Sequence, residues 1–293
     1  MNKAMRNPLV YILFVLPAII LYFMFFIYPF VTSGYYSFFD WDGLQAPKYI
    51  GFQNFIRLFH DEDFRLATIN NLYFILFSVF IQVPLIVFFS LLISSVKKFQ
   101  SFYKTTVFMP SVISTSVIGI LWGFIYHPDM GLLNNFLGLF GIGKIYWLSD
   151  LKTALLSVLI TNAWQWMGFY IVLILAAILA IPKELSEAAA IDGANGFQKA
   201  TKITVPLIMP VISVVIMLSI AGAMRVVDII LVMTNGGPAG ATDVMASYMV
   251  TKAINFGMYG YGNAIAIVIF VFAMVLTALY QILIARKIER NEF

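Results

Sequence analysis

Aromatic and amide side chains gather in the middle of one long apolar stretch, at about residues 153–181. The set comprises Asn162, Trp164, Gln165, Trp166 and Tyr170. It begins about 10 residues into the stretch, near mid-membrane depth at about 1.5 Å per residue, whereas tryptophans normally lie at membrane interfaces. Aromatic faces and groups that both donate and accept hydrogen bonds suit a sugar. Packing and hydrogen bonding between helices is the alternative explanation.

Two charged residues lie inside another apolar stretch. Arg225 and Asp228 are three residues apart, so on one helix they would share a face and could pair. Charges inside a span commonly mark function. However, Arg225 lies about 28 Å along a helix that begins at Pro206, near the outer interface, where a long side chain reaches water. A structural ion pair is therefore favoured over a role in substrate binding or gating.

The other side chains offer little for catalysis or metal binding. The chain has no cysteine and two histidines, which excludes disulfides, Fe–S clusters and thiolate zinc sites. No phosphate-binding loop of the Gly-x-x-x-x-Gly-Lys-Ser/Thr type occurs. We expect no catalytic residue, no metal and no cofactor in this chain. His60 with Asp61, Glu62 and Asp63 is the one cluster that a membrane enzyme could use, and an acidic surface loop explains it better.

The elements that position these residues are predicted to be membrane-spanning helices. Of the 293 residues, 61% are hydrophobic and 11% are charged, against about a quarter charged in soluble domains. The sequence predicts an all-α integral membrane protein with one domain and six spans, at about 9–36, 70–95, 103–126, 153–181, 206–233 and 261–285. The first is too long for a signal peptide and is expected to be retained. Short interfacial helices are expected at 52–59 and 132–139.

Basic residues indicate the orientation. One side of the membrane would carry eleven: Lys3, Arg6, Lys97, Lys98, Lys104, Lys183, Lys199, Lys202, Arg286, Lys287 and Arg290. The other side would carry six in much longer loops. The positive-inside rule then places both termini in the cytoplasm. The net charge is +4. We expect the chain to contact membrane lipid and not nucleic acid.

The loop at 182–206 would then face the cytoplasm. Pro182 suits the first turn of a helix, and Lys183 to Ile191 is rich in helix formers. Gly193 and Gly196 permit a sharp turn before a second short helix. The result would be a compact helix–turn–helix with small residues that allow another body to approach. An ordinary loop against the lipid headgroups is equally compatible with the pattern.

A motif in this loop resembles one of a known family. Glu187-Ala188-Ala189, Gly193, Ile203 and Pro206 match the cytoplasmic loop of ABC importer permeases, with Val205 where leucine is usual. The resemblance implies a type I permease bundle whose loop docks on a cytoplasmic ATPase dimer, which would bind the ATP and Mg²⁺. Glu187 would then face a basic group of the ATPase, Gly193 would form the turn, and Asp192 would lie on the docking face with Ala188 and Ala189.

Further segments resemble sugar permeases of the maltose type. They include Phe38–Gly43, Gly51–Phe55, Thr234–Pro238 and Gly260–Ala264. This resemblance implies a prokaryotic cell-membrane subunit that moves a sugar or oligosaccharide by alternating access. It also implies a second permease and an extracytoplasmic sugar-binding protein as partners. Gly168 and Tyr170 fall where the family places pocket residues, and Asn235 would lie beside the pore mouth.

Two other transport functions stay open. An ABC permease for another solute would share the loop motif but would lack the sugar-permease segments. An autonomous secondary transporter would need membrane carboxylates for ion coupling, and the spans offer Asp228 alone.

Overall fold

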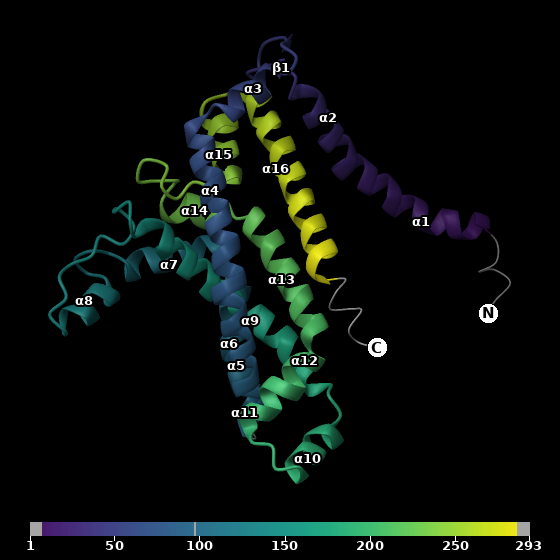
Figure 1. Cartoon of the computed structure of the whole chain (residues 1–293). Coiled ribbons are helices and arrows are strands. Elements are labelled where there is room, and N and C mark those ends of the chain that lie inside the picture. Colours follow the sequence, from purple (N-terminus) through teal and green to yellow (C-terminus); the bar gives the residue numbers. More distant parts are fainter. Residues whose placement is uncertain (1–7, 97, 286–293) are drawn as a thin grey trace. The chain divides into compact units, whose positions relative to one another are not determined.

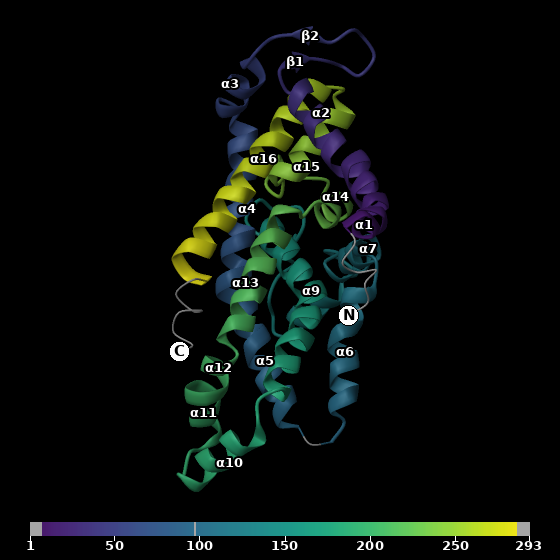
Figure 2. The ribbon, with the colours of Figure 1, turned by 90° about the vertical axis from the view of Figure 1, so that its right-hand side faces the viewer.

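The computed structural model describes residues 8–96 and 98–285 (Figures 1 and 2). This part of the chain is helical except for loops and one antiparallel pair of short strands, β1 (Phe39–Asp40) and β2 (Lys48–Tyr49). The expected all-α fold is confirmed. Of the basic residues that predict the orientation, six lie outside the described residues: Lys3, Arg6, Lys97, Arg286, Lys287 and Arg290.

The described chain divides into two compact units. The first unit runs to Asp61 and includes Met249–Phe270. Its helices are α1 (Pro8–Tyr22), α2 (Tyr28–Tyr36), α3 (Gln53–Phe59) and the first half of α16 (Tyr259–Tyr280), with π-helical turns at Phe23–Ile27 and Thr251–Asn255. Asn54 fixes the β1–β2 hairpin, because its buried amide donates to the carbonyls of Ser37 and Phe39, both at 2.9 Å.

The second unit comprises Glu62–Tyr248 and continues from Val271. A long helix is formed by α4 (Glu62–Phe77), a π-helical turn at Ser78–Gln82 and α5 (Val83–Ser95). The other helices are α6 (Gln100–Val112), α7 (Thr115–Ile125), α8 (Leu132–Gly138), α9 (Ala154–Leu179), α10 (Lys183–Ile191), α11 (Gly196–Lys199), α12 (Val205–Leu207), α13 (Met209–Met224), α14 (Asp228–Met233) and α15 (Met245–Val250). Two further π-helical turns, at Ala200–Thr204 and Gln281–Ala285, complete this unit.

The central helix of this unit is α9, which packs against α5, α6, α7 and α13. It is rich in leucine and alanine, and it ends just before Pro182, as helices usually do before a proline. Ile86 of α5, Ile174 of α9 and Val215 of α13 meet in a fully buried core. Where lipid surrounds a bundle, such a core is stabilised by close packing rather than by removal from water.

Four of the six expected spans coincide with continuous helices, at Ile12–Tyr36, Glu62–Ser95, Ala154–Leu179 and Tyr259–Leu283. The third and fifth do not. The third is bent by 99° between α6 and α7, where Ile113 and Ser114 are extended after Pro110. The fifth is bent by 69° between α12 and α13, and it ends at Met224 rather than at 233. Six spans therefore result only if each bent pair crosses the membrane once.

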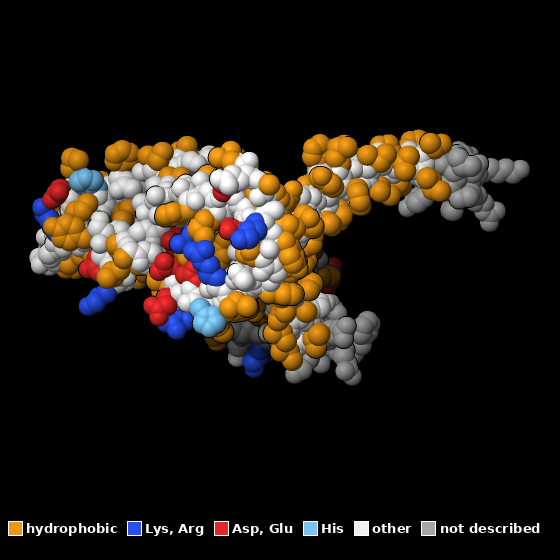
Figure 3. Space-filling view, turned by 90° about the horizontal axis from the view of Figure 1, so that it is seen from above, with side chains coloured by type: hydrophobic (Ala, Val, Ile, Leu, Met, Phe, Trp, Pro, Cys, Tyr) orange, Lys and Arg blue, Asp and Glu red, His pale blue; other side chains and the backbone are white. Residues whose placement is uncertain are grey.

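Apolar side chains are exposed along these helices. Phe14 in α1 is 83% exposed, and Phe80 and Phe124 in the second unit are each 70% exposed. Figure 3 shows hydrophobic side chains along α1. Exposed apolar side chains along long helices form a surface that suits contact with lipid.

Within the second unit, α10 and α11 lie at one end, beyond the ends of α5 and α9 (Figures 1 and 2). The α14 helix lies toward the other end, beside α7. The loop with the permease-like motif and the break between α13 and α14 are therefore separated along the length of this unit.

Candidate functional site

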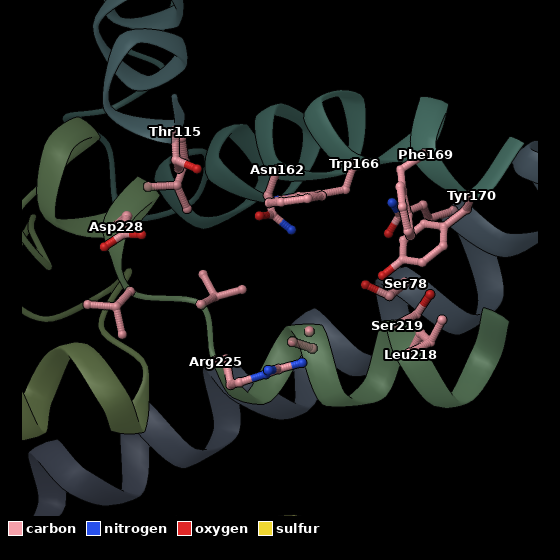
Figure 4. Close-up of a pocket in the computed structure, with 16 residues that line it drawn as sticks. Ser78, Thr115, Asn162, Trp166, Phe169, Tyr170, Leu218, Ser219, Arg225 and Asp228 are labelled. Atoms are coloured by element: carbon pink, nitrogen blue, oxygen red, sulfur yellow. The ribbon is translucent and has the colours of Figure 1, made fainter. Parts of the chain in front are cut away.

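A cavity of about 450 Å³ lies within the second unit, between α9, α13 and the π-helical turn Ser78–Gln82 (Figure 4). Asn162, Trp166 and Tyr170 of α9 line it, four residues apart, so successive turns of one helix face present them to the same space. In Figure 4, Asn162 and Trp166 extend from α9 into the cavity. Its volume is within the range of small-molecule sites, roughly 300–1,000 Å³.

One end of the cavity is rich in hydroxyl groups. The Tyr170 hydroxyl points toward Ser78 and Ser219 (Figure 4). Ser219 is 4% exposed, and its Oγ lies near the Tyr170 hydroxyl without a hydrogen bond of good geometry. Buried polar atoms are nearly always paired, so an unpaired one at a cavity wall indicates a missing partner.

The π-helical turn places two polar residues that the sequence analysis missed. Ser78 and Gln82 line the cavity and are 5% and 3% exposed. The Gln82 amide donates to the Ala163 carbonyl at 3.4 Å. Short π-helical segments inside α-helices are frequent at functional sites. The available signal was Gln82 itself, a polar residue in the middle of an apolar span.

The other end of the cavity carries two charged residues, Arg225 and Asp228. The prediction that they share one helix face and pair was wrong, because α13 ends at Met224 and α14 begins at Asp228. Arg225 instead turns back on its own helix, with Nε donating to the Ala221 carbonyl at 3.3 Å. Figure 4 shows the Arg225 and Asp228 side chains on different sides of the cavity.

Four of the predicted pathway residues do not line the cavity. Trp164 packs edge-on against Trp122, with ring centroids 5.5 Å apart. Gln165 is buried and donates to the Ile113 carbonyl and to Thr115 Oγ1, at 3.3 and 3.1 Å. Gly168 and Asn235 are also elsewhere. Gly168 faces the backbone of α6, and Asn235 is exposed after α14.

The predicted helix–turn–helix loop is formed by α10 and α11. Gly193 has φ +79°, a conformation that favours glycine, and the Ala194 N–H donates to the Ala189 carbonyl at 2.9 Å. Asn195 then begins α11 with a reciprocal pair of hydrogen bonds, in which its side chain accepts from the Gln198 N–H and its own N–H donates to Gln198 Oε1. The expected sharp turn is present at Gly193, whereas Gly196 is helical.

The loop exposes both apolar and charged side chains. Ile191 is 87% exposed and Phe197 is 78% exposed. Glu187, Ala188 and Asp192 are exposed, and Ala189 is buried. Ile203 lies in the π-helical turn Ala200–Thr204, and Pro206 lies in α12. Such a surface can dock on a second protein. In the described part of the chain, no group of three or more His, Asp or Glu side chains could hold a metal ion.

Comparisons with known proteins give a consistent result. The family described as binding-protein-dependent transport system inner membrane component matches residues 64–289. The chain is 36% identical over 278 residues to the probable ABC transporter permease protein YurN of Bacillus subtilis, covering 93% of this chain and 94% of that protein. It is 32% identical over 269 residues to the trehalose/maltose transport system permease protein MalF of Thermococcus litoralis, covering 92% and 91%.

A solved structure is similar over nearly the whole chain. It is a chain of a bacterial alginate ABC transporter in complex with alginate pentasaccharide-bound periplasmic protein. The TM-score is 0.86 at 26% sequence identity, and the match covers 98% of this chain and 97% of that one.

Proposed function

This chain belongs to the family of binding-protein-dependent transport system inner membrane components, and we propose that it forms the membrane path for a sugar or oligosaccharide. The observation that carries the proposal is the cavity, where the Trp166 ring lies beside amide and hydroxyl groups. The substrate class is supported by the names of its relatives, which include a trehalose/maltose permease and an arabinooligosaccharides permease.

The cavity residues would each make a different kind of contact with a saccharide. The Trp166 ring offers an apolar face to the C–H surface of a pyranose. Asn162 and Tyr170 supply groups that both donate and accept. The unpaired Ser219 Oγ would gain a partner from a sugar hydroxyl. Arg225 and Asp228 bring opposite charges to the other end, so the wall has no large net charge to neutralise.

The loop formed by α10 and α11 would couple this cavity to a cytoplasmic ATPase. Glu187 would pair with a basic group of the ATPase, and the small Ala188 would allow close approach. Gly193 would hold the turn. Asp192, Ile203 and Pro206 would complete the docking element, with Ala189 packed on its inner side. ATP and Mg²⁺ would bind the ATPase, whose closure would switch the bundle between inward-open and outward-open packing.

The assembly would contain two permease chains, because an ATPase dimer offers two docking grooves and this chain carries one coupling loop. We expect the second permease to be a similar chain, and a sugar-binding protein to deliver the solute from outside. Both termini would be cytoplasmic, as the positive-inside rule predicts. The membrane would be the cell membrane of a prokaryote.

Two tryptophans of α9 allow a matched test. Trp166 lines the cavity and Trp164 does not, yet they are 39% and 40% exposed. In proteoliposomes that contain the whole transporter, Trp166→Ala should raise the KM for saccharide uptake at least tenfold, as expected for loss of roughly 1.4 kcal/mol of binding. Trp164→Ala should leave the KM near its original value. A cavity role is contradicted if Trp166→Ala has no effect, or if Trp164→Ala has the larger one.

A further inference from the structure

The break between α13 and α14 leaves backbone carbonyls at the end of α13 without their usual helical partners, and three of them accept hydrogen bonds from other donors. The last carbonyls of a helix need such partners, especially where no water is present. Arg225 satisfies two of them, since its Nε donates to the Ala221 carbonyl and its N–H to the Gly222 carbonyl. The Ala223 carbonyl accepts from Asn71 Nδ2 of α4, at 2.9 Å. A side chain 152 residues away thus closes the end of α13.

The oxygen of the Asn71 side-chain amide caps the N-terminus of a second helix, α15. Asn71 Oδ1 accepts from the N–H of Met245, the first residue of α15, at 2.8 Å. Asn71 has no exposed surface. A reversed amide would set NH₂ against an N–H and oxygen against a carbonyl, so only this orientation fits both partners. Asn71 therefore ends α13 and begins α15 with one side chain.

The neighbouring residue makes a different set of bonds. Asn70 is 2% exposed, and its Nδ2 donates to the carbonyls of Ala241 and Asp243, at 3.1 and 2.8 Å. Both acceptors belong to the loop that joins α14 to α15. Asn70 thus holds this loop alone, whereas Asn71 holds the end of the loop and the end of α13.

The loop between α14 and α15 is held together by hydrogen bonds among its own residues. Thr242 Oγ1 donates to the Gly237 carbonyl at 2.8 Å and lies 2.7 Å from Thr234 Oγ1. Ser247 Oγ donates to Asp243 Oδ1 at 2.7 Å. These hydrogen bonds join Thr234 at the start of the loop to Thr242 near its end, an arrangement that favours movement of the loop as one piece.

The hydrogen bond from Asn71 to Ala223 reaches the wall of the cavity. Ala223 lines the cavity, and so does Val226 in the break that follows α13. Ser78, seven residues after Asn71, lies in the π-helical turn that continues α4 and lines the same cavity. We infer that Asn71 is a positioning residue that ties the α13–α14 wall of the cavity to the loop before α15, so that the two shift together. The inference rests on the proposed function in one respect, that the cavity holds the transported solute.

The absence of cysteine from the chain permits a direct test with introduced thiols. Val226 is 9% exposed in the cavity wall, and Val244 is fully buried at the end of the loop. Val226→Cys and Val244→Cys would report the opening of each place in the assembled transporter, by the rate of reaction with a small methanethiosulfonate reagent. The labelling test needs neither saccharide nor ATP. The inference about Asn71 can therefore be wrong while the proposed function is right, and it can be right while the proposed function is wrong.

Asn71→Leu keeps the size of the side chain and removes both hydrogen bonds. It should raise the labelling rate at both reporters about tenfold, the factor that loss of one buried hydrogen bond produces in an opening equilibrium. Asn70→Leu is the matched control from the adjacent position. It should raise the rate of the Val244→Cys reporter and leave the Val226→Cys reporter protected. Thermal unfolding of the complex checks that both variants are equally folded.

If Asn71→Leu does not assemble, Asn71→Asp serves instead, measured at a pH where the carboxyl is ionised, because it keeps an acceptor for the Met245 N–H and replaces the NH₂ donor to the Ala223 carbonyl by a carboxylate oxygen. It should raise the rate of the Val226→Cys reporter more than that of the Val244→Cys reporter. The inference is overturned if the Val226→Cys reporter stays protected in the Asn71 variant that assembles. It is also overturned if Asn70→Leu exposes that reporter to the same extent, because a general loosening would then explain both.

Discussion

Gly168 of α9 lies directly against the carbonyl of Val107 in α6, so the two helices touch with no side chain between them. A Cβ atom at position 168 would overlap that carbonyl. Small residues allow such close approach in membrane bundles. The glycine that the sequence analysis assigned to the solute pathway therefore has a packing contact in the structure, two residues from the cavity residue Trp166.

Gly168→Ala should separate α6 from α9. We expect a loss of roughly 1–3 kcal/mol, as for other overpacked sites, and a lower midpoint of thermal unfolding in detergent. Gly123→Ala is the control, because position 123 is also helical but a Cβ atom there would meet no atom within 4 Å. An unchanged midpoint for Gly168→Ala would contradict the contact.

Gly193→Val should uncouple ATP hydrolysis from transport without removing the chain from the membrane. The residue has φ +79°, where a β-branched side chain costs roughly 1–3 kcal/mol. The strain would tilt α10 away from the ATPase on which we propose that it docks. Gly196→Val tests the same change at a helical position with open space. The readout is ATPase activity stimulated by the binding protein, and equal losses in the two variants would argue against a special role of the turn at Gly193.

Glu187→Gln should weaken association with the ATPase. If this exposed carboxylate becomes buried against a basic group in the complex, loss of its charge should cost about 2–5 kcal/mol. Glu184→Gln removes another exposed charge from the same helix, three residues earlier. Co-purification of the ATPase with each variant is the measurement. Normal recovery with Glu187→Gln, or a larger loss with Glu184→Gln, would place the docking contact elsewhere.

We expect Asn134 to stabilise the segment after α7 more than the neighbouring ion pair between Lys144 and Asp129 does. Its buried amide donates to the carbonyls of Pro128 and Ile145 and accepts from Trp147 Nε1 at 2.9 Å. The Lys144 ammonium hydrogen-bonds Asp129 and holds the pKa of that carboxyl below its ordinary value, so the pair stays charged at neutral pH. Both partners are exposed, and solvent screens the pair.

Asn134→Ala should therefore increase proteolytic cleavage between residues 127 and 152, because it leaves buried backbone groups unpaired. Lys144→Met should change the cleavage rate little. A larger effect of Lys144→Met would show that the ion pair, and not the buried amide, holds the segment.

The resemblance to ABC importer permeases is confirmed by the family match, and much of the fold follows from local patterns. The short helices expected at 52–59 and 132–139 correspond to α3 and α8. The turn at Gly193 could be predicted because glycine is the residue that a positive φ requires. The roles of the coupling and pathway residues remain predictions.

The break between α13 and α14 could not be read from the sequence. Neither glycine nor proline lies between Met224 and Asp228, and the end of α13 is closed by Asn71 from a distant helix. The π-helical turn at Ser78–Gln82 is marked in the apolar span by Gln82, but the sequence analysis did not use this signal and missed both cavity residues. The choice of Trp166 over Trp164 depends on the rotation of α9, which packing against its neighbours decides.

Uptake by the purified transporter tests the central claim most directly. The whole complex would be placed in proteoliposomes with ATP on the ATPase side and a saccharide-loaded binding protein on the other. We predict accumulation of the saccharide that requires both ATP and the binding protein, and none by this chain alone. Accumulation by this chain alone, or ATP-driven uptake of a solute that is not a saccharide while saccharides are refused, would contradict the account.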